Sequence, residues 1–386
     1  MSVYLDHAAT TPMAPAAIEA MLRQMTRLGN PSSLHVFGRE VRKDLEGARE
    51  SIAMAVDCHP SEIIFTASGT EADNTALKGL YWKGQAVGRN VVVISAMEHH
   101  AILDPAGWLK THEGAEVIEL GVDRYGHVDM LELENLISRR ADEIAVISIM
   151  SSNNETGVIQ PIESVVEMAR PSSIPVHTDA VQSFGKVPLS FRSFGVTAMS
   201  LSAHKLGGPI GVGALILRKG FDVPALLHGG GQERDIRSGT FNAPAILSFA
   251  AAVKENSKDL ADGNARIVGL RKKLETGIFH RVPDAYINGF VSKRLPGIVN
   301  VTIPGTESDT LQLLLDNEGI ACSTGSACSA GVQRPSHVLI AMGHTDVTAR
   351  SSVRFSLGAT TTEADIDEVL RVLPTVVERA RMANIR

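Results

Sequence analysis

A lysine and an aspartate each follow an apolar stretch of this chain, and together they could hold a cofactor that carries an aldehyde. Lys205 ends the run 200–205, where apolar residues give way to hydroxyls and a histidine, and the glycine-rich run 206–213 follows. Asp179 follows the apolar residues 174–177. Most lysines in such places are solvated loop residues, but a desolvated lysine with a lowered pKa can form a Schiff base. An acid beneath a pyridine ring and a lysine on its aldehyde are the groups that pyridoxal phosphate (PLP) needs most, so the pair favours a PLP site.

A cysteine in a segment almost free of large side chains is a third candidate for chemistry. Cys328 lies within residues 323–331, which are mostly serine, glycine, alanine and threonine. A free cysteine is usually a small buried hydrophobe, but this polar, glycine-rich setting argues against burial. We therefore expect Cys328 to be a nucleophile on a mobile loop. Cys322 ends the apolar run 319–321, so we expect its thiol to be packed and inert.

Residues 67–74 open a predicted helix with a glycine and several hydroxyls. The free N–H groups of Gly69 and Thr70 and the helix dipole would make an anion site, suited to a phosphate. An ordinary helix cap by Ser68, with Glu71 in the first turn, explains the same residues equally well. The sequence leaves both interpretations open at this point.

The elements that must position these residues alternate along the first two thirds of the chain. Predicted strands cover 62–66, 90–95, 116–120, 143–150, 174–177 and 213–218, and predicted helices cover 14–28, 37–56, 67–83, 101–112 and 129–139. Such alternation predicts an α/β fold with a mostly parallel sheet and helices on both faces. Ligands in such sheets bind at the carboxyl ends of the strands. The polar clusters lie at those ends, at residues 98–100, 152–157, 179–182 and 202–205.

A second, smaller α+β domain is predicted after the helical region 243–282. Its strands would cover 298–303, 320–322 and 352–357, and its helices 309–318, 335–342 and 362–381. We expect a large domain over 15–260 and a small domain over 1–14 and 261–386. The small domain would carry the Cys328 loop.

Composition limits the classes of function. The chain has 386 residues, 44% apolar and 21% charged, which is ordinary for a globular protein. A net charge of −6 gives no reason to expect nucleic acid or an anionic membrane as partner. No signal peptide is expected at residues 1–11, and three cysteines argue for a reducing compartment, so we expect a cytoplasmic protein. No metal site is predicted.

The motifs in combination resemble the NifS/IscS-type cysteine desulfurases, which are PLP enzymes of aminotransferase class V and fold type I. The resemblance covers essentially the whole chain. Its motifs are residues 8–12, 29–33, 98–99, 153–155, 177–182, 202–205, 237–240, 323–328 and 354–358. Departures are modest: residues 359–360 replace a basic or aromatic pair, Cys322 replaces a small non-thiol residue, and 68–70 is an uncommon variant of its motif.

The resemblance implies roles for individual residues. Lys205 would bind the PLP aldehyde as a Schiff base, and Asp179 would pair with the pyridinium nitrogen. The residues implied to touch the rest of the cofactor are His99 on the ring face, Gln182 at the ring hydroxyl, and Gly69, Thr70, Ser202 and His204 at the phosphate, with Thr240 from the other subunit of a homodimer. Arg354, Asn154 and Asn30 would bind the substrate, and Asn154 would also lie against the cofactor. Lys205, His99 and Cys328 would be catalytic.

By the same resemblance, the reaction converts L-cysteine to L-alanine, and Cys328 holds the sulfur as a persulfide. The sulfur then passes to an acceptor protein such as an iron–sulfur scaffold. Three alternatives remain. A class V aminotransferase would share Lys205 and Asp179 but would not need Cys328. A selenocysteine lyase would act on selenium in place of sulfur and otherwise share the chemistry. A non-enzymatic scaffold would have lost Lys205, Asp179 or Cys328, and this chain keeps all three.

Overall fold

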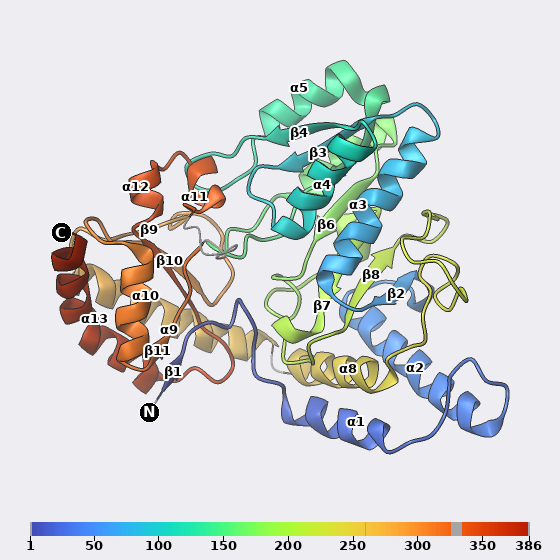
Figure 1. Cartoon of the computed structure of the whole chain (residues 1–386), viewed down its shortest axis with the longest axis horizontal. Coiled ribbons are helices and arrows are strands. Elements are labelled where there is room, and N and C mark those ends of the chain that lie inside the picture. The colour runs from blue at the N-terminus through green and yellow to red at the C-terminus, as the bar shows by residue number, and fades with distance from the viewer. Residues whose placement is uncertain (1, 259, 326–333, 385–386) are drawn as a thin grey trace.

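A seven-stranded sheet forms the centre of the larger part of the molecule (Figure 1). The computed structural model describes residues 2–258, 260–325 and 334–384. The strands lie in the order β2 (Ile63–Thr66), β8 (Gly213–Leu217), β7 (Ala198–Ser202), β6 (Val176–Asp179), β5 (Ile144–Ser148), β3 (Val91–Ser95) and β4 (Glu116–Leu120). Only β8 runs against the others. The predicted fold class, a mostly parallel sheet flanked by helices, is confirmed.

Strand β8 is antiparallel because the connection from β7 is too short for a crossover. Residues 203–212 contain one 3-10 turn over Ala203–Lys205 and the glycine-rich run, whereas a parallel strand would need a dozen or more residues, usually with a helix. Lys205 therefore sits in a tight turn between two central strands. That turn holds its backbone at the carboxyl end of β7.

Helices cover both faces of this sheet, and alternate strand residues point to each. Ile64, Val92 and Ile94 pack with α3 (Gly69–Gln85) and α4 (His100–His112). Val91, Val93 and Phe65 face the opposite core. That opposite core is built with α1 (Pro15–Met25), α2 (Val36–Ala55), α5 (Met130–Arg140), α6 (Ile162–Ala169), α7 (Phe191–Phe194) and α8 (Ala243–Lys258). Burial on both faces explains why the strands read as continuous apolar runs.

The last third of the chain, together with the first strand, forms a separate core on the left of Figure 1. Its sheets are β12 (Ser352–Ser356), β10 (Ile298–Thr302) and β9 (Tyr286–Ile287), which are antiparallel, and β1 (Val3–Tyr4) with β11 (Ile320–Ala321), which are parallel. Its helices are α9 (Leu260–Arg281), α10 (Ser308–Asn317) and α13 (Glu363–Asn384). The short helices α11 (His337–Ala341) and α12 (Asp346–Ala349) instead form a small cluster with Met97. The chain thus begins in this part and crosses to the large sheet. As a result, residues 6–14 pass between the two parts (Figure 1).

A buried ion pair fastens the loop after β8 to the large sheet. The Arg49 guanidinium donates to both carboxylate oxygens of Glu233 at 3.1 Å, and the Phe65 N–H donates to the same carboxylate at 3.2 Å. Arg49 and Glu233 are 7% and 2% exposed. The pair holds the glycine-rich loop that leads to Thr240.

We expect Glu233→Ala to destabilise the protein by about 3–5 kcal/mol, because it leaves the Arg49 charge buried without its acid. Glu46→Ala is the matched control, since Glu46 also pairs with Arg49 but from an exposed position, at 3.3 Å. Its loss should cost less than about 1 kcal/mol. Thermal unfolding midpoints of both variants measure the difference, and equal shifts would contradict the expectation.

Candidate active site

A cavity of about 410 Å³ lies at the carboxyl ends of the parallel strands. It brings together ten of the residues predicted from the sequence: Gly69, Thr70, His99, Asn154, Asp179, Gln182, Ser202, His204, Lys205 and Arg354. These residues come from five strand ends and from β12 of the smaller core. Backbone of Ala8 and Ala9 and residues 323–325 complete the wall.

Three predicted site residues are not among those that line this cavity. Asn30 lies exposed in the loop between α1 and α2, where its own side chain accepts from the Ser32 N–H at 2.9 Å. Thr240 is exposed beyond the loop after β8. Cys328 lies outside the described residues, although Gly325, three positions before it, lines the cavity.

Lys205 is held by the backbone of the N-terminal segment. Its Nζ donates to the carbonyl oxygens of Ala8 and Ala9, each at 2.7 Å. Burial and the Arg354 charge lower the pKa of Lys205 to about 8, against the opposing pull of the Asp179 and Asp6 carboxylates. The small residues at 8–10 therefore serve a close backbone approach to this amine. An amine with this pKa has a much larger neutral fraction at physiological pH than an ordinary lysine, as a nucleophile needs.

Asp179 shares its surroundings with a second buried acid that the sequence reasoning missed. Burial raises the pKa of Asp179 to about 6, while the Val181 N–H donates to its Oδ1 at 2.8 Å and favours the charge. Asp73 on α3 is 1% exposed, and burial and the Asp179 charge raise its pKa well above its usual value. Its Oδ1 has no hydrogen-bond partner among the described residues. The pair therefore favours a neutral Asp73 and an ionised Asp179. The sequence feature that could have indicated Asp73 is its spacing: it lies one helical turn beyond Gly69, on the same face of the helix.

The first residue of α3 is packed so closely against Val181, which follows β6, and Ser202, which ends β7, that position 69 requires a glycine. A Cβ on Gly69 would lie 2.8 Å from Val181 Cγ2 and 3.3 Å from Ser202 Cβ. The Ser68 side chain caps the helix by accepting from the Glu71 N–H at 3.1 Å. Ser68 is therefore an ordinary helix cap, as one interpretation predicted. Gly69 and Thr70 are the first residues of a 17-residue helix, and both line the cavity. Amides at a helix N-terminus together with the hydroxyls of Thr70 and Ser202 suit a phosphate.

Two histidines of the cavity wall are neutral near physiological pH. Burial and the neighbouring Lys205 charge lower the pKa of His99 and the pKa of His204 to about 4. His99 also caps α4, since its Nδ1 accepts from the Ala101 N–H at 3.1 Å. A neutral, fixed imidazole can lie against an aromatic ring without bringing a charge.

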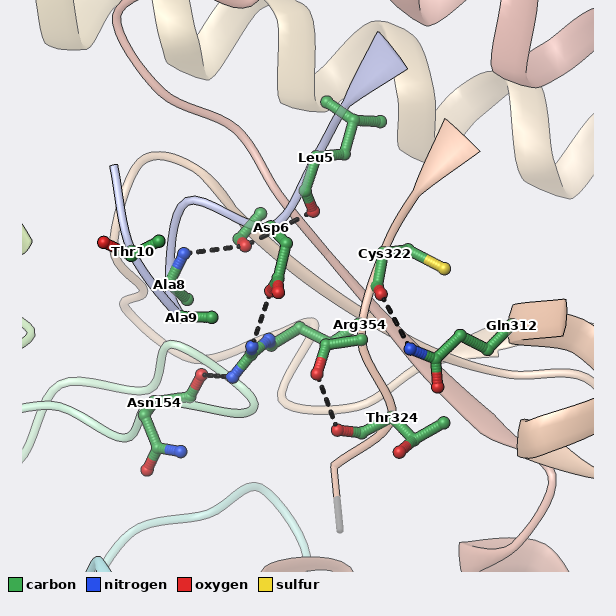
Figure 2. A network of polar contacts seen from close by, with 12 residues as sticks. Leu5, Asp6, Ala8, Ala9, Thr10, Asn154, Gln312, Cys322, Thr324 and Arg354 are labelled. Carbon is green, nitrogen blue, oxygen red and sulfur yellow. Dashed lines mark hydrogen bonds and ion pairs between the residues drawn. The ribbon is translucent and has the colours of Figure 1, made fainter. Parts of the chain in front are cut away.

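Arg354 joins the two cores at the cavity, as Figure 2 shows. Its guanidinium donates to Asp6 Oδ1 at 2.8 Å and to the Asn154 carbonyl oxygen at 2.9 Å. It is 6% exposed, and its Nε has no hydrogen-bond partner among the described residues. The sequence analysis did not predict the partnership of Arg354 with Asp6. A buried guanidinium with a remaining donor is suited to a carboxylate ligand.

Cys322 is packed away from this chemistry, as expected. It is 5% exposed within the smaller core, and burial and the Asp6 charge raise its thiol pKa to about 12. Figure 2 shows its side chain turned away from the Arg354 guanidinium. Such a thiol is a poor nucleophile.

Comparison with known proteins shows the family of this chain. The family model for aminotransferase class V matches residues 3–369. The chain is 48% identical to the IscS-like cysteine desulfurase of Mycobacterium tuberculosis, covering 99% of this chain and 98% of that protein. It is 42% identical to the cysteine desulfurase IscS of Methanosarcina thermophila, covering 98% and 93%. A solved NifS-like protein superimposes with a TM-score of 0.91 at 36% identity, covering 98% of this chain and 100% of that one. The chain therefore belongs to the aminotransferase class V family and, within it, to the IscS/NifS cysteine desulfurases.

Proposed function

We propose that this protein converts L-cysteine to L-alanine with PLP and passes the sulfur, through a persulfide on Cys328, to an acceptor protein. The observation that carries the proposal is one cavity that holds the amine of Lys205, the carboxyl of Asp179 and the guanidinium of Arg354. In that order, these groups can bind an aldehyde, a pyridine nitrogen and a substrate carboxylate. Relatives that are 48% and 42% identical to this chain are named cysteine desulfurases.

Enzymes of this family depend on PLP, and the residues present fit it. Lys205 would hold the aldehyde, Asp179 the ring nitrogen, and the amides of Gly69 and Thr70 the phosphate. Ser202 and His204 would also contact the phosphate, and His99 and Gln182 would contact the ring. When bound, PLP supplies an electron sink that stabilises negative charge developing at the amino-acid carbon.

The residues of this chain then have separable tasks. Arg354 binds the substrate carboxylate, and Asn154, whose backbone it contacts, lines the cavity beside it. The Lys205 amine, with its pKa lowered to about 8, can take and return a proton near neutral pH. Asp179 keeps the ring nitrogen protonated because its own charge is stabilised by the Val181 N–H. Cys328 supplies the thiolate that takes the sulfur.

The test is to supply L-cysteine to the PLP-bound protein and to measure sulfide, with a reductant present, and alanine. We expect the two in equal amounts. An aminotransferase would instead form a keto acid and no sulfide, and that result would overturn the proposal. Parallel assays with L-selenocysteine compare kcat/KM for the two chalcogens, and a preference for selenocysteine would favour the lyase.

We expect Arg354→Ala to raise KM for cysteine about 10–100-fold, because a charged hydrogen bond is worth about 1.5–3 kcal/mol. Steady-state kinetics measure the change. Asp6→Asn is the control, since it removes the acid partner but keeps the guanidinium, and it should raise KM less. Equal effects of the two substitutions would show that Arg354 acts only by holding Asp6.

We also propose a homodimer in which Thr240 reaches the phosphate of the neighbouring subunit. Support comes from apolar side chains that the single chain leaves exposed around α1. Ile18, Leu22 and Met25 share one face of that helix and are 44%, 59% and 64% exposed. Leu28, Leu34, Val36 and Phe37 continue the exposed apolar surface along the chain. Such a surface is typical of an obligate interface.

Sedimentation of the PLP-bound protein at micromolar concentration should give a dimer. Leu22→Asp with Met25→Asp should give monomers with weakened PLP binding, because each site would lose the partner's Thr240. Met54→Asp is the control, since Met54 is 84% exposed on α2 and outside that surface. A fully active monomer would contradict the proposal.

Three further assignments remain proposals. The protein that accepts the sulfur would be one such as an iron–sulfur scaffold. The protein itself would be located in the cytoplasm, in keeping with the free cysteines Cys58 and Cys322. No helix in the described ranges has the length and apolar character to cross a bilayer. The domain limits, 15–260 against 1–14 and 261–386, are supported by the separate apolar cores of α8 and α9.

A further inference from the structure

A second lysine beside the active site has no role in the reaction described above. The Nζ of Lys186 donates to Gln182 Oε1 at 2.8 Å. Burial and the charges of Lys205 and Arg354 lower the pKa of Lys186 to about 7. The ion pairs formed by the described residues include none with Lys186. A cation near two other cations and without an acid partner is costly, so its position calls for an explanation.

Lys186 is linked to the reactive lysine by a continuous series of hydrogen bonds. Gln182 Nε2 donates to the Ala8 carbonyl oxygen at 2.8 Å, and Lys205 Nζ donates to that same oxygen at 2.7 Å. The two nitrogens therefore lie within two hydrogen-bond lengths of each other. A group joined to Lys205 Nζ would therefore have the Gln182 amide nitrogen nearby.

The contact with Lys186 decides which way the Gln182 amide faces. Lys186 Nζ donates to the amide oxygen, and in its ammonium form it can only donate, so that form requires this orientation of the amide. The amide N–H groups are thereby directed toward Ala8 and Lys205. Because Gln182 is 6% exposed, water has little access to stabilise the opposite orientation. A cation on the amide oxygen also polarises the amide and strengthens its N–H groups as donors.

A second cavity gives the Lys186 side chain access to open space. This cavity has a volume of about 550 Å³. Its wall is formed in part by residues of the N-terminal segment 7–15, including His7, and also by Lys186 and Lys205. Ala8 and Lys205 also line the active-site cavity. Lys186 thus has space for solvent on one side and the Gln182 amide on the other.

The chemistry of PLP places an oxygen on the ring carbon next to the one that bears the aldehyde. With the aldehyde held by Lys205, the Gln182 N–H groups would be the donors available to that ring oxygen. We propose that Lys186 is a positioning residue for PLP: it orients the Gln182 amide and, through it, stabilises the ionised ring oxygen. The inference rests on the proposed function, because it requires PLP on Lys205.

The test uses Lys186→Met and Lys186→Arg in the PLP-bound protein at one fixed pH. Two readouts are the absorption spectrum of bound PLP, which reports protonation of the ring oxygen, and the PLP dissociation constant. Lys186→Met should shift the spectrum toward the neutral ring oxygen and weaken PLP binding about 3–10-fold, the range for one lost hydrogen bond. Lys186→Arg should restore most of both. Lys254→Met, an exposed lysine on α8, is the matched control.

A double variant separates this role from general support of the fold. In a Gln182→Leu background, Lys186→Met should cause no further spectral shift, because its effect passes through the amide. Gln182→Glu, which can pair with Lys186 but offers no N–H, should reproduce the spectral shift even if Lys186→Met fails to fold. An unchanged spectrum in Lys186→Met, or a shift that persists in the Gln182→Leu background, would overturn the inference. Failure of the proposed function is distinct: the unaltered protein would then carry no borohydride-reducible PLP on Lys205, or would form a keto acid and no sulfide from cysteine.

Discussion

Lys205→Ala should abolish covalent attachment of PLP and lower the rate of sulfide formation by at least about 10²–10⁴-fold, the range for losing an acid–base group. The expected loss is large because one amine has two tasks. It binds the aldehyde, and its pKa, lowered to about 8 by burial and the Arg354 charge, suits it for moving a proton at the substrate carbon. Borohydride reduction followed by peptide mass analysis measures attachment, and sulfide assays measure the rate.

Lys254→Ala is the control for this experiment, since that lysine is exposed on α8 and should leave both measurements unchanged. The PLP affinity of Lys205→Ala adds a second test. Noncovalent binding should persist, because the phosphate site at Gly69 and Thr70 and the ring contacts of Asp179 do not depend on the lysine. Reducible attachment of PLP in Lys205→Ala would place the Schiff base on another lysine and refute the assignment.

Cys328→Ser should abolish sulfide release, whereas Cys322→Ser should keep most activity. Cys322 is 5% exposed and its thiol pKa is raised to about 12, so it carries almost no thiolate at neutral pH. Gly325 lines the active-site cavity, and Cys328 follows three positions later in the sequence among small residues. A sulfur carrier must reach both the substrate and the acceptor, and Cys328 is the thiol whose sequence setting allows this.

Mass analysis after incubation with cysteine should find the added sulfur on the peptide that contains Cys328. Cys328→Ser should still bind cysteine, as a change in the absorption of bound PLP would report, because Arg354 and Lys205 are intact. Sulfur on Cys322, together with an active Cys328→Ser variant, would reverse the assignment.

Much of the fold and of the site could be predicted from local sequence patterns. The apolar runs and the glycine punctuation predict the alternation of strands and helices, and the predicted ends differ from the observed ones by a few residues. Because parallel strands end at one edge, residues that follow them, such as His99, Asp179 and Lys205, had to meet there. Burial of Cys322 also followed from its apolar neighbours.

Other parts of the site depended on contacts between segments far apart in the chain. Arg354 and Asp6 are 348 positions apart, and no local pattern indicates that they pair. No local pattern indicates either that the Ala8 carbonyl oxygen accepts hydrogen bonds from both Gln182 and Lys205.

What the sequence by itself determined was the chemistry available: an amine, an acid and a guanidinium, each attached to an element whose type its neighbours dictate. What only the tertiary structure decided was the state of those groups. Packing placed Asp73 against Asp179, Lys186 against Gln182, and Arg354 between Asp6 and Asn154. The reason is physical, because a pKa and the direction of an amide depend on solvent exclusion and on charges brought close by folding.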